Sequence, residues 1–574
     1  MKELSPSMDA VMDSLIKNLT AKGSMFETEN RNLDGIDYPF FKNLLPNLNS
    51  LYQMGGQFSD KKFLVHHDKS LTFKGTLERV EKLAKILVAE YGLKKNDRVG
   101  IAMRNSPEWC IAFMAITAAG GVAVAMNSWW KKDELIYAIK DTNPRVMFVD
   151  DKRCSYIEPF IEEYGFNVVI DKLSDNFSYT HSHRSIACFD ELMNKKLEDS
   201  ILLPEVNQND NAVIFYTSGS TGFPKGALST HRMLLNTIFT WALTATAFGL
   251  LNQKKDKPAE HQLSALLCLP LFHVTACYSA FLLSLAIGRK IVFIDKWDVE
   301  IAMQKIEEEK VTHFIGVPTM SYELLHCTKR EEYDLSSLAE IGGGGSARPS
   351  SQVKEIQEAF QIPLTTGYGM TETNGVGCIN GGDNYLEKPD SVGKATAPTT
   401  LIKIVDDNGV EVCTGQRGEI LIKSASNIKC YWNDEKATDE LFVDGWVKTG
   451  DIGFLDEQEY LFIVDRKKDI VIRGGENIST QEVESSIAAH PSVKEVCVFG
   501  IPDERLGEVP IAIAALHDKA ELSKESLIHF LNNNIAHFKV PVDIQIMCGA
   551  LPRGATGKMD KLNIRKEYLN SLLK

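Results

Sequence analysis

A segment rich in glycine and hydroxyl side chains, with one lysine, has the composition of a polyphosphate-binding loop. It reads Tyr-Thr-Ser-Gly-Ser-Thr-Gly-Phe-Pro-Lys-Gly at residues 216–226, between an apolar run at 212–215 and a helix expected to begin near Thr230. Glycines let a backbone approach a ligand closely, and Lys225 adds positive charge. The segment is not a Walker A loop, because Lys225 follows a proline rather than a glycine. Its candidate phosphate-binding residues are Thr217, Ser218, Gly219, Ser220, Thr221 and Gly222.

A second segment, at residues 366–373, places an aromatic ring, a hydroxyl and a carboxylate on a glycine-containing turn. Tyr368 can stack on a base, Thr371 can bind a phosphate, and Glu372 can hold Mg²⁺, which prefers few carboxylates plus phosphate oxygens. The other candidate residues of this segment are Thr366, Gly367 and Gly369.

Three further segments add weaker signals. A glycine-rich run at 342–347 lacks the strand, helix and acidic residue of a dinucleotide-binding unit. Asp451 ends a Gly-Trp-Val-Lys-Thr-Gly-Asp segment, where it can accept two ribose hydroxyls or bond its own backbone in a turn. Lys558 ends a glycine-flanked loop at 552–558, a setting in which a lysine is ordinarily solvated.

Together and in this order, the five segments closely resemble the signatures of adenylate-forming enzymes, a group that includes acyl-CoA synthetases, adenylation domains and luciferases. The resemblance extends from about residue 65 to 560 and is greatest to medium- or long-chain fatty acid–CoA ligases. It implies that ATP is bound by the loop and turn residues above together with Ala347, Asp451 and Arg466, and that Gly475 leaves room for coenzyme A.

The resemblance also implies a catalytic set and a metal site. Lys558 would reach the α-phosphate and the carboxylate, and the small C-terminal domain would pivot at Lys468. Thr217 and Glu372 would hold Mg²⁺. The residues assigned to catalysis are Lys558, Glu372, Thr371, Lys225 and His273.

The predicted activity is ATP-dependent conversion of a carboxylic acid to an acyl-adenylate, with release of pyrophosphate, followed by transfer to coenzyme A. His273 lies in an apolar segment with no carboxylate before Asp295. An amino acid is therefore disfavoured, because a buried ammonium without a partner costs several kcal/mol. Residues expected near the acyl pocket favour a fatty or aromatic acid: Phe239, Trp241, Val317, Met370 and Val376.

Four alternatives stay open at this stage. One is an acyl-AMP ligase that loads a carrier protein, and another is an aryl acid–CoA ligase. A nucleotide-binding sensor without catalysis is opposed by the presence of Lys558, Glu372 and Asp451. A membrane transport role is suggested only by the uncharged segment at 264–288, which we expect, like 111–130, to be buried core.

The composition of the chain disfavours some classes of function and predicts a cellular compartment. The net charge of −14 disfavours nucleic-acid binding, and the 11 cysteines are too scattered for a zinc site or disulfide framework. The first residues lack a signal-peptide pattern, so we expect a cytoplasmic protein with reduced thiols. We expect a monomer or homodimer without an integral membrane segment, and peripheral membrane association through a lipid substrate remains open.

The elements that must position these residues belong to an α/β fold. Strands expected at 97–103, 145–150 and 166–171 alternate with helices such as 106–119. The chain is long enough for at least two domains. We predict a large N-terminal domain at 1–464, with mostly parallel sheets flanked by helices and, by resemblance, a small β-barrel-like part. A hinge at 465–469 and a small mobile α+β domain at 470–574 follow.

Overall fold

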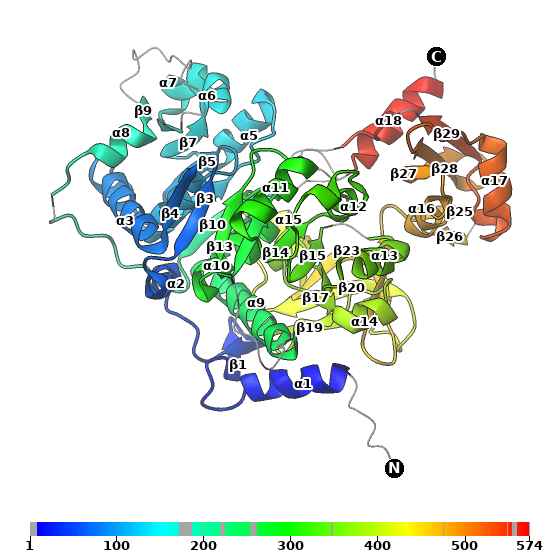
Figure 1. Cartoon of the computed structure of the whole chain (residues 1–574), viewed down its shortest axis with the longest axis horizontal. Helices are drawn as coiled ribbons and strands as arrows, with labels where there is room; N and C mark the ends of the chain where they lie inside the picture. The colour runs from blue at the N-terminus through cyan, green and yellow to red at the C-terminus, as the bar shows by residue number, and fades with distance from the viewer. Residues whose placement is uncertain are drawn as a thin grey trace.

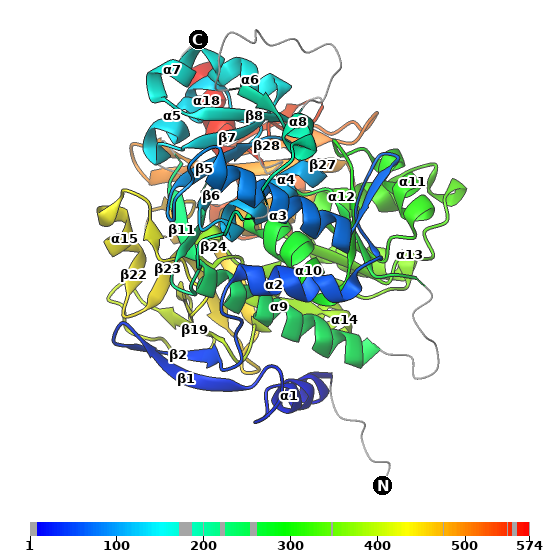
Figure 2. The ribbon, with the colours of Figure 1, turned by 90° about the vertical axis from the view of Figure 1, so that its left-hand side faces the viewer.

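The body of the protein is built from two large sheets with helices between them and on their outer faces (Figures 1 and 2). This computed structural model describes residues 8–171, 186–198, 200–217, 224–252, 261–345, 348–474, 476–547, 549–553 and 559–572. Central strands of both sheets are parallel. Antiparallel pairs lie at both edges of the nine-stranded sheet and at one edge of the eight-stranded sheet. The predicted α/β class with mostly parallel sheets is therefore confirmed.

The first large sheet has nine strands, and it positions the 366–373 segment at the end of a central strand. Its order is β18 (Lys394–Ala395), β17 (Cys378–Gly381), β16 (Leu364–Tyr368), β15 (Glu340–Gly344), β14 (His313–Gly316), β12 (Ser264–Leu267), β13 (Lys290–Phe293), β3 (Lys62–His66) and β4 (Lys69–Thr72). Helices α11 (Val299–Glu309), α12 (Pro318–His326) and α13 (Ser350–Phe360) cover its outer face.

The second large sheet has eight strands and positions both ends of the 216–226 loop. Its order is β21 (Cys430–Tyr431), β11 (Gly226–Thr230), β10 (Asn211–Tyr216), β6 (Val122–Ala125), β5 (Arg98–Ala102), β7 (Val146–Asp150), β8 (Asn167–Asp171) and β9 (Ile186–Cys188). Helices α5 (Lys132–Thr142), α6 (Asp151–Ile157) and α7 (Ile161–Tyr164) pack on its outer face.

The largest core cluster lies between the two sheets and joins strands of both to the inner helices. These inner elements are α2 (Leu48–Gly55), α3 (Phe73–Ala89), α4 (Pro107–Ala118), α8 (Phe189–Asn194), α9 (His231–Asn252), a π-helix (Thr275–Leu282) and α10 (Leu283–Ile287). Helix α4 begins where Ser106 Oγ accepts a hydrogen bond from the Trp109 amide at 3.2 Å, and eleven of its twelve residues are buried.

The two uncharged segments singled out above are core elements, as predicted. Residues 264–288 form strand β12, a loop, the π-helix and α10, and residues 111–130 form most of α4 and strand β6. Within the described part of the chain, one helix is long and apolar enough to cross a membrane, at His231–Leu251. More than half of its most apolar window, 56%, is buried inside the fold, which is typical of a core helix.

Two smaller sheets follow along the chain, the first antiparallel and the second mixed. The first, which corresponds to the predicted β-barrel-like part, contains β19 (Thr400–Val405), β20 (Gly418–Ser424), β22 (Phe442–Val443), β23 (Trp446–Leu455) and β24 (Leu461–Arg466). Helix α15 (Glu435–Leu441) neighbours this sheet, whereas α14 (Gly382–Glu387) packs against β16 and β17 of the nine-stranded sheet. A short 3₁₀ helix, η5 (Thr371–Thr373), follows β16.

The C-terminal elements form a separate small α+β unit, set to one side of the body in Figure 1. Its sheet contains β25 (Val471–Arg473), β26 (Glu476–Ile478), β27 (Val493–Asp503), β28 (Gly507–Leu516) and β29 (Asp543–Met547). Its helices are α16 (Thr480–Ala488), α17 (Lys524–Asn532) and α18 (Lys561–Leu572). Ser479 Oγ accepts a hydrogen bond from the Glu482 amide at 3.1 Å and so caps the start of α16.

Residues before the first large sheet form α1 (Met8–Leu19) and a hairpin of β1 (Thr28–Leu33) and β2 (Ile36–Phe41), both visible in blue at the lower edge of Figure 1. The hairpin region packs on α9, where the Phe26 and Phe41 rings lie 6.1 Å and 5.6 Å from the Phe239 ring. Phe239 is thus a core residue beneath this N-terminal segment.

Candidate active site

Three sheets meet where the sequence places its phosphate, magnesium and ribose candidates. Strands β10, β11 and β21 come from the eight-stranded sheet, β15 and β16 from the nine-stranded sheet, and β23 and β24 from the small antiparallel sheet. The loop at 216–226 is closed at its base, since the Thr217 amide donates to the Lys225 carbonyl at 2.9 Å. Several candidates lie outside the described residues: Ser218, Gly219, Ser220, Thr221, Gly222, Ala347, Gly475 and Lys558.

The magnesium candidate, Glu372, is a buried carboxylate in η5 with one hydroxyl donor. Tyr431 Oη donates to Glu372 Oε1 at 2.6 Å, and the Glu372 carbonyl accepts from the Ile428 amide at 2.9 Å. Burial raises the pKa of the Glu372 carboxyl above its usual value, and the Tyr431 hydrogen bond opposes this shift. Lys225 Nζ lies 5.2 Å from the centre of the Tyr431 ring, so the loop lysine and the carboxylate flank one tyrosine.

The candidates for base stacking and ribose binding form a second group of interacting side chains. Tyr368 Oη donates to Asp451 Oδ2 at 2.6 Å, and Arg466 Nε lies 3.4 Å from Asp451 Oδ1. Asp451 and Arg466 face each other directly on β23 and β24, which explains how residues 15 positions apart form this pair. Burial raises the pKa of Asp451, while the Arg466 charge and the Tyr368 hydrogen bond lower it.

The two groups are close enough to interact electrostatically. The Arg466 charge lowers the pKa of Glu372, and the Asp451 charge raises it. The site therefore combines two buried carboxylates with an arginine and a lysine, a charge arrangement that can bind a nucleotide with a metal ion. Thr371, the candidate phosphate ligand, lies between Met370 and Glu372 at the start of η5.

Glycines keep the ends of β15 and β16 open beside helix α9. Gly344 pairs with Gly367, and a side chain at Gly367 would lie 3.8 Å from the Trp241 ring. At Gly369 a Cβ atom would approach the Gly375 backbone to 2.6 Å, so only glycine fits. Thr366 pairs with Asn380 on β17, so the whole 366–369 candidate segment lies at the same strand end.

His273 follows β12 in the loop before the π-helix. Its amide donates to the Pro270 carbonyl at 3.1 Å, and its ring lies 4.6 Å from the Phe272 ring. Of the other residues expected near the acyl pocket, Val376 is fully buried, and Val317 and Met370 are half-buried against separate core clusters. Trp241 is thus the apolar candidate that faces the glycine strand ends most directly.

A buried polar network behind the site had no signal in the sequence. Asn374 Nδ2 donates to the Ser426 carbonyl at 2.6 Å, and its Oδ1 accepts from Tyr278 Oη at 3.0 Å. Ser229 Oγ is 2.9 Å from Asn374 Nδ2. Asn374 has a φ of +52°, and the network holds this turn directly after Glu372 in place. Tyr431 was missed as well, since only its position opposite Glu372 reveals its role.

The predicted hinge contacts both parts of the chain. Arg466 is the last residue of β24, whereas Asp465 Oδ2 accepts from Thr480 Oγ1 at 3.0 Å and the Gln481 amide at 3.3 Å, at the start of α16. Lys468 lies between the two units, and burial lowers the pKa of its ammonium group.

Known proteins resemble this chain in sequence and in fold over most of its length. The AMP-binding enzyme family matches residues 52–432, and the AMP-binding enzyme C-terminal domain matches 482–558. The long-chain-fatty-acid–CoA ligase of Bacillus subtilis (strain 168) is 30% identical over 541 residues, which cover 90% of this chain and 93% of that enzyme. The 2-succinylbenzoate–CoA ligase of Listeria monocytogenes is 32% identical over 505 residues, 88% of this chain and 96% of that one.

A solved structure gives the same result in three dimensions. The o-succinylbenzoate CoA synthetase of Bacillus subtilis, in complex with ATP and a magnesium ion, has a TM-score of 0.76 and 28% identity, covering 91% of this chain and 99% of its own. The same enzyme is also known with its acyl-adenylate intermediate. This chain belongs to the AMP-binding enzyme family.

Within that family, the predicted enzyme class is confirmed: the chain is an acid–thiol ligase that works through an acyl-adenylate. ATP and Mg²⁺ are the cofactors, and coenzyme A the co-substrate, of this class of ligase, as predicted. The relatives act on different acids, aliphatic and aromatic, so they do not identify a single substrate.

Proposed function

We propose that this ligase activates an apolar carboxylic acid of the fatty acid class and transfers its acyl group to coenzyme A. The main supporting observation is that two groups of side chains lie at the junction of three sheets. The first group is Glu372 and Lys225 on either side of Tyr431. The second is Tyr368, Asp451 and Arg466. One buried carboxylate with a tyrosine donor suits Mg²⁺, which takes its remaining ligands from phosphate and water.

The first half-reaction makes the carboxylate reactive. A carboxylate is a poor electrophile, because its leaving group would be oxide. When the acid oxygen attacks the ATP α-phosphorus, the α–β bond breaks, pyrophosphate leaves, and AMP becomes the leaving group on the acyl carbon. Bound Mg²⁺ supplies positive charge that offsets the negative charge on the phosphate oxygens. Lys225 adds to this charge, and Asp451 would orient the ribose through its hydroxyls.

The second half-reaction forms the thioester. The coenzyme A sulfur attacks the acyl carbon, the acyl–oxygen bond breaks, AMP leaves, and the thiol proton is released. Lys558 would occupy the space beside this carbon in the first half-reaction, so we propose that it withdraws by rotation of the unit at 470–574 about Lys468. The contacts of Asp465 with the start of α16 support placing the hinge at 465–469, after a body at 1–464.

The apolar surroundings of the glycine-containing ends of β15 and β16 favour an apolar acid as the substrate. Trp241 lies beside Gly367, the strand partner of Gly344, and the 268–278 segment that contains His273 has no carboxylate. An amino acid would bury its ammonium without a partner here, which costs several kcal/mol. An aryl acid fits the same apolar surroundings and is the main alternative, as the 2-succinylbenzoate–CoA ligase relative illustrates.

An acid panel tests the proposal. Pyrophosphate release and CoA thioester formation are measured in parallel with ATP, Mg²⁺ and acids from acetate to long-chain fatty acids, plus benzoates. Fatty acids should give the highest kcat/KM for both products. A higher kcat/KM for benzoates would indicate that the substrate is an aryl acid rather than a fatty acid. Pyrophosphate release without any thioester from free coenzyme A would indicate a carrier-protein acceptor instead.

Two substitutions test the rotation. Lys558→Ala should abolish adenylate formation and leave the conversion of supplied acyl-AMP and coenzyme A intact. Gly475→Leu should do the reverse, because a side chain there would block the pantetheine arm. Equal loss of both half-reactions in both variants would contradict the proposal of two conformations. The cytoplasmic setting and the oligomeric state stay predictions from the sequence.

A further inference from the structure

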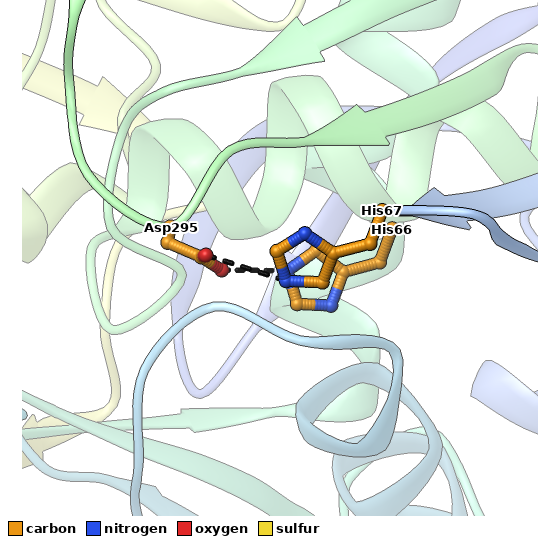
Figure 3. Close-up of side chains that lie close together, drawn as sticks. All are labelled: His66, His67 and Asp295. Carbon is orange, nitrogen blue, oxygen red and sulfur yellow. Dashed lines mark hydrogen bonds and ion pairs between the residues drawn. The ribbon is translucent and has the colours of Figure 1, made fainter. Parts of the chain in front are cut away.

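Two histidines and one aspartate converge at the edge of the nine-stranded sheet, away from the nucleotide site. Figure 3 shows the His66 and His67 rings side by side, both directed at Asp295. His66 Nε2 lies 2.7 Å from Asp295 Oδ1, and His67 Nε2 lies 3.3 Å from Asp295 Oδ2. The three donor atoms all lie within 4.8 Å of one another.

The fold explains why residues 229 positions apart meet here. His66 is the last residue of β3, and β3 pairs in parallel with β13, which ends at Phe293. Both strands therefore present their carboxyl ends at the same edge of the sheet, and Asp295 follows two residues beyond Phe293. The buried Phe293 ring packs beside the His66 ring, with the two ring centres 5.7 Å apart.

The backbone at His67 places consecutive side chains on one side. In a regular strand, neighbouring side chains point to opposite faces. His67 begins the turn to β4 with a φ of +53°, an uncommon conformation for a residue other than glycine. As a result the two imidazole rings stack with centres 4.1 Å apart and an angle of 29° between their planes. Both present Nε2 to the same carboxylate.

We propose that His66, His67 and Asp295 bind a divalent first-row transition metal, with zinc as the ion best matched to the donors. Two imidazole nitrogens and one carboxylate oxygen are zinc ligands, whereas magnesium and calcium prefer oxygen alone. Zinc–nitrogen and zinc–oxygen bonds of about 2.0–2.1 Å in a tetrahedron separate the donors by about 3.3 Å. The distance from His67 Nε2 to Asp295 Oδ2 already equals this value. His66 Nε2 lies closer, at 2.7 Å, to the other carboxylate oxygen, Oδ1, so Asp295 has to turn to offer one oxygen to an ion held by both rings.

The exposure of the three side chains suits an open site with water as the fourth ligand. His66 is 15% exposed, whereas His67 and Asp295 are 63% and 51% exposed, so an ion can enter from solvent and the two outer side chains can adjust. The ion would connect the β3–β4 turn to the connection between β13 and α11. In the strand order, β3 is five positions from β16, or about 24 Å at about 4.8 Å per strand, so this site is separate from the nucleotide site.

Zinc binding to the full-length protein, treated with chelator and free of ATP, provides the test. We expect one equivalent of zinc, measured by equilibrium dialysis and metal analysis, to be lost in the His66→Gln/His67→Gln double variant. Asp295→Asn should weaken the affinity more than about 10-fold, since even a residue that only supports a metal ligand contributes 10- to 100-fold. His326→Gln is the matched control, because His326 pairs with Glu355 at 3.3 Å without a second histidine.

Two further measurements keep the test independent of folding. Bound Co²⁺ should give visible absorption bands of a nitrogen-containing, four-coordinate site in the parent and in His326→Gln, and not in the double variant. Zinc should raise the Tm of the parent and leave that of the double variant unchanged, while the two have the same Tm without metal. Equal zinc stoichiometry and equal Co²⁺ spectra in the parent and the double variant would overturn the proposal, and so would a parent that takes up no zinc.

Discussion

The contact between Tyr431 and Glu372 offers the sharpest test of the proposed magnesium site. Tyr431 is 9% exposed and Glu372 is 7% exposed, and their 2.6 Å hydrogen bond gives the buried carboxylate its hydroxyl donor. Tyr431→Phe removes this hydroxyl and keeps the ring next to Lys225. The substitution therefore changes one hydrogen bond and almost no packing.

Two magnitudes follow from this geometry. A hydrogen bond to a charged group contributes about 1.5–3 kcal/mol, and a partner that orients a metal ligand contributes about 10- to 100-fold in metal affinity. The Mg²⁺ concentration for half-maximal pyrophosphate release should therefore rise about 10- to 100-fold in Tyr431→Phe. The free energy of unfolding should fall by about 1.5–3 kcal/mol at a pH where Glu372 is ionised.

The sign of the pH dependence can be derived as well. The hydrogen bond stabilises the charged carboxylate, so its removal raises the pKa of Glu372 further in the folded state. The difference in the free energy of unfolding between the parent and Tyr431→Phe should therefore be largest at high pH, where Glu372 is ionised. The difference should shrink as the pH falls through the raised pKa of Glu372, because a protonated carboxyl needs no donor. Urea unfolding at several pH values measures this trend.

Tyr460→Phe is the matched control. Tyr460 Oη donates to Asp9 at 2.8 Å, a comparable hydrogen bond to a carboxylate on α1, outside the group of residues assigned to the nucleotide. It should lower stability without changing the Mg²⁺ requirement. If Tyr431→Phe shows the same Mg²⁺ dependence as the parent, Glu372 does not hold the metal in the proposed way.

Three further outcomes are expected. Tyr368→Phe removes the 2.6 Å hydrogen bond to Asp451 and should raise KM for ATP about 10-fold, with kcat changed less, in steady-state kinetics; an unchanged KM would separate Asp451 from ribose binding. Because burial raises the pKa of both Glu372 and Asp451, kcat/KM for ATP should decline on the acid side at a pH above that of ordinary carboxyls, and a flat profile down to acid unfolding would contradict this. Trp241→Ala should shift kcat/KM about 10-fold toward bulkier acids across the panel, and an unchanged ranking would place the pocket elsewhere.

Local patterns in the sequence were sufficient for the class of enzyme and for many elements. The order of the five motifs needs no tertiary information, because each motif lies on a continuous stretch that must fit one part of a nucleotide. Short-range rules also predicted the strand found at Val146–Asp150 and the helix that begins after Ser106, since both patterns act over a few neighbouring residues.

Other features were decided only when distant strands paired. Tyr431 lies 59 residues after Glu372, and Asp295 lies 229 residues after His66, so no spacing rule could connect them. The charge environment of Glu372 likewise depends on Arg466 and Asp451 from another sheet. Hydrophobic periodicity and turn chemistry act over a few residues and specify local elements, whereas sheet order specifies which strand ends meet, and chemistry occurs where they meet.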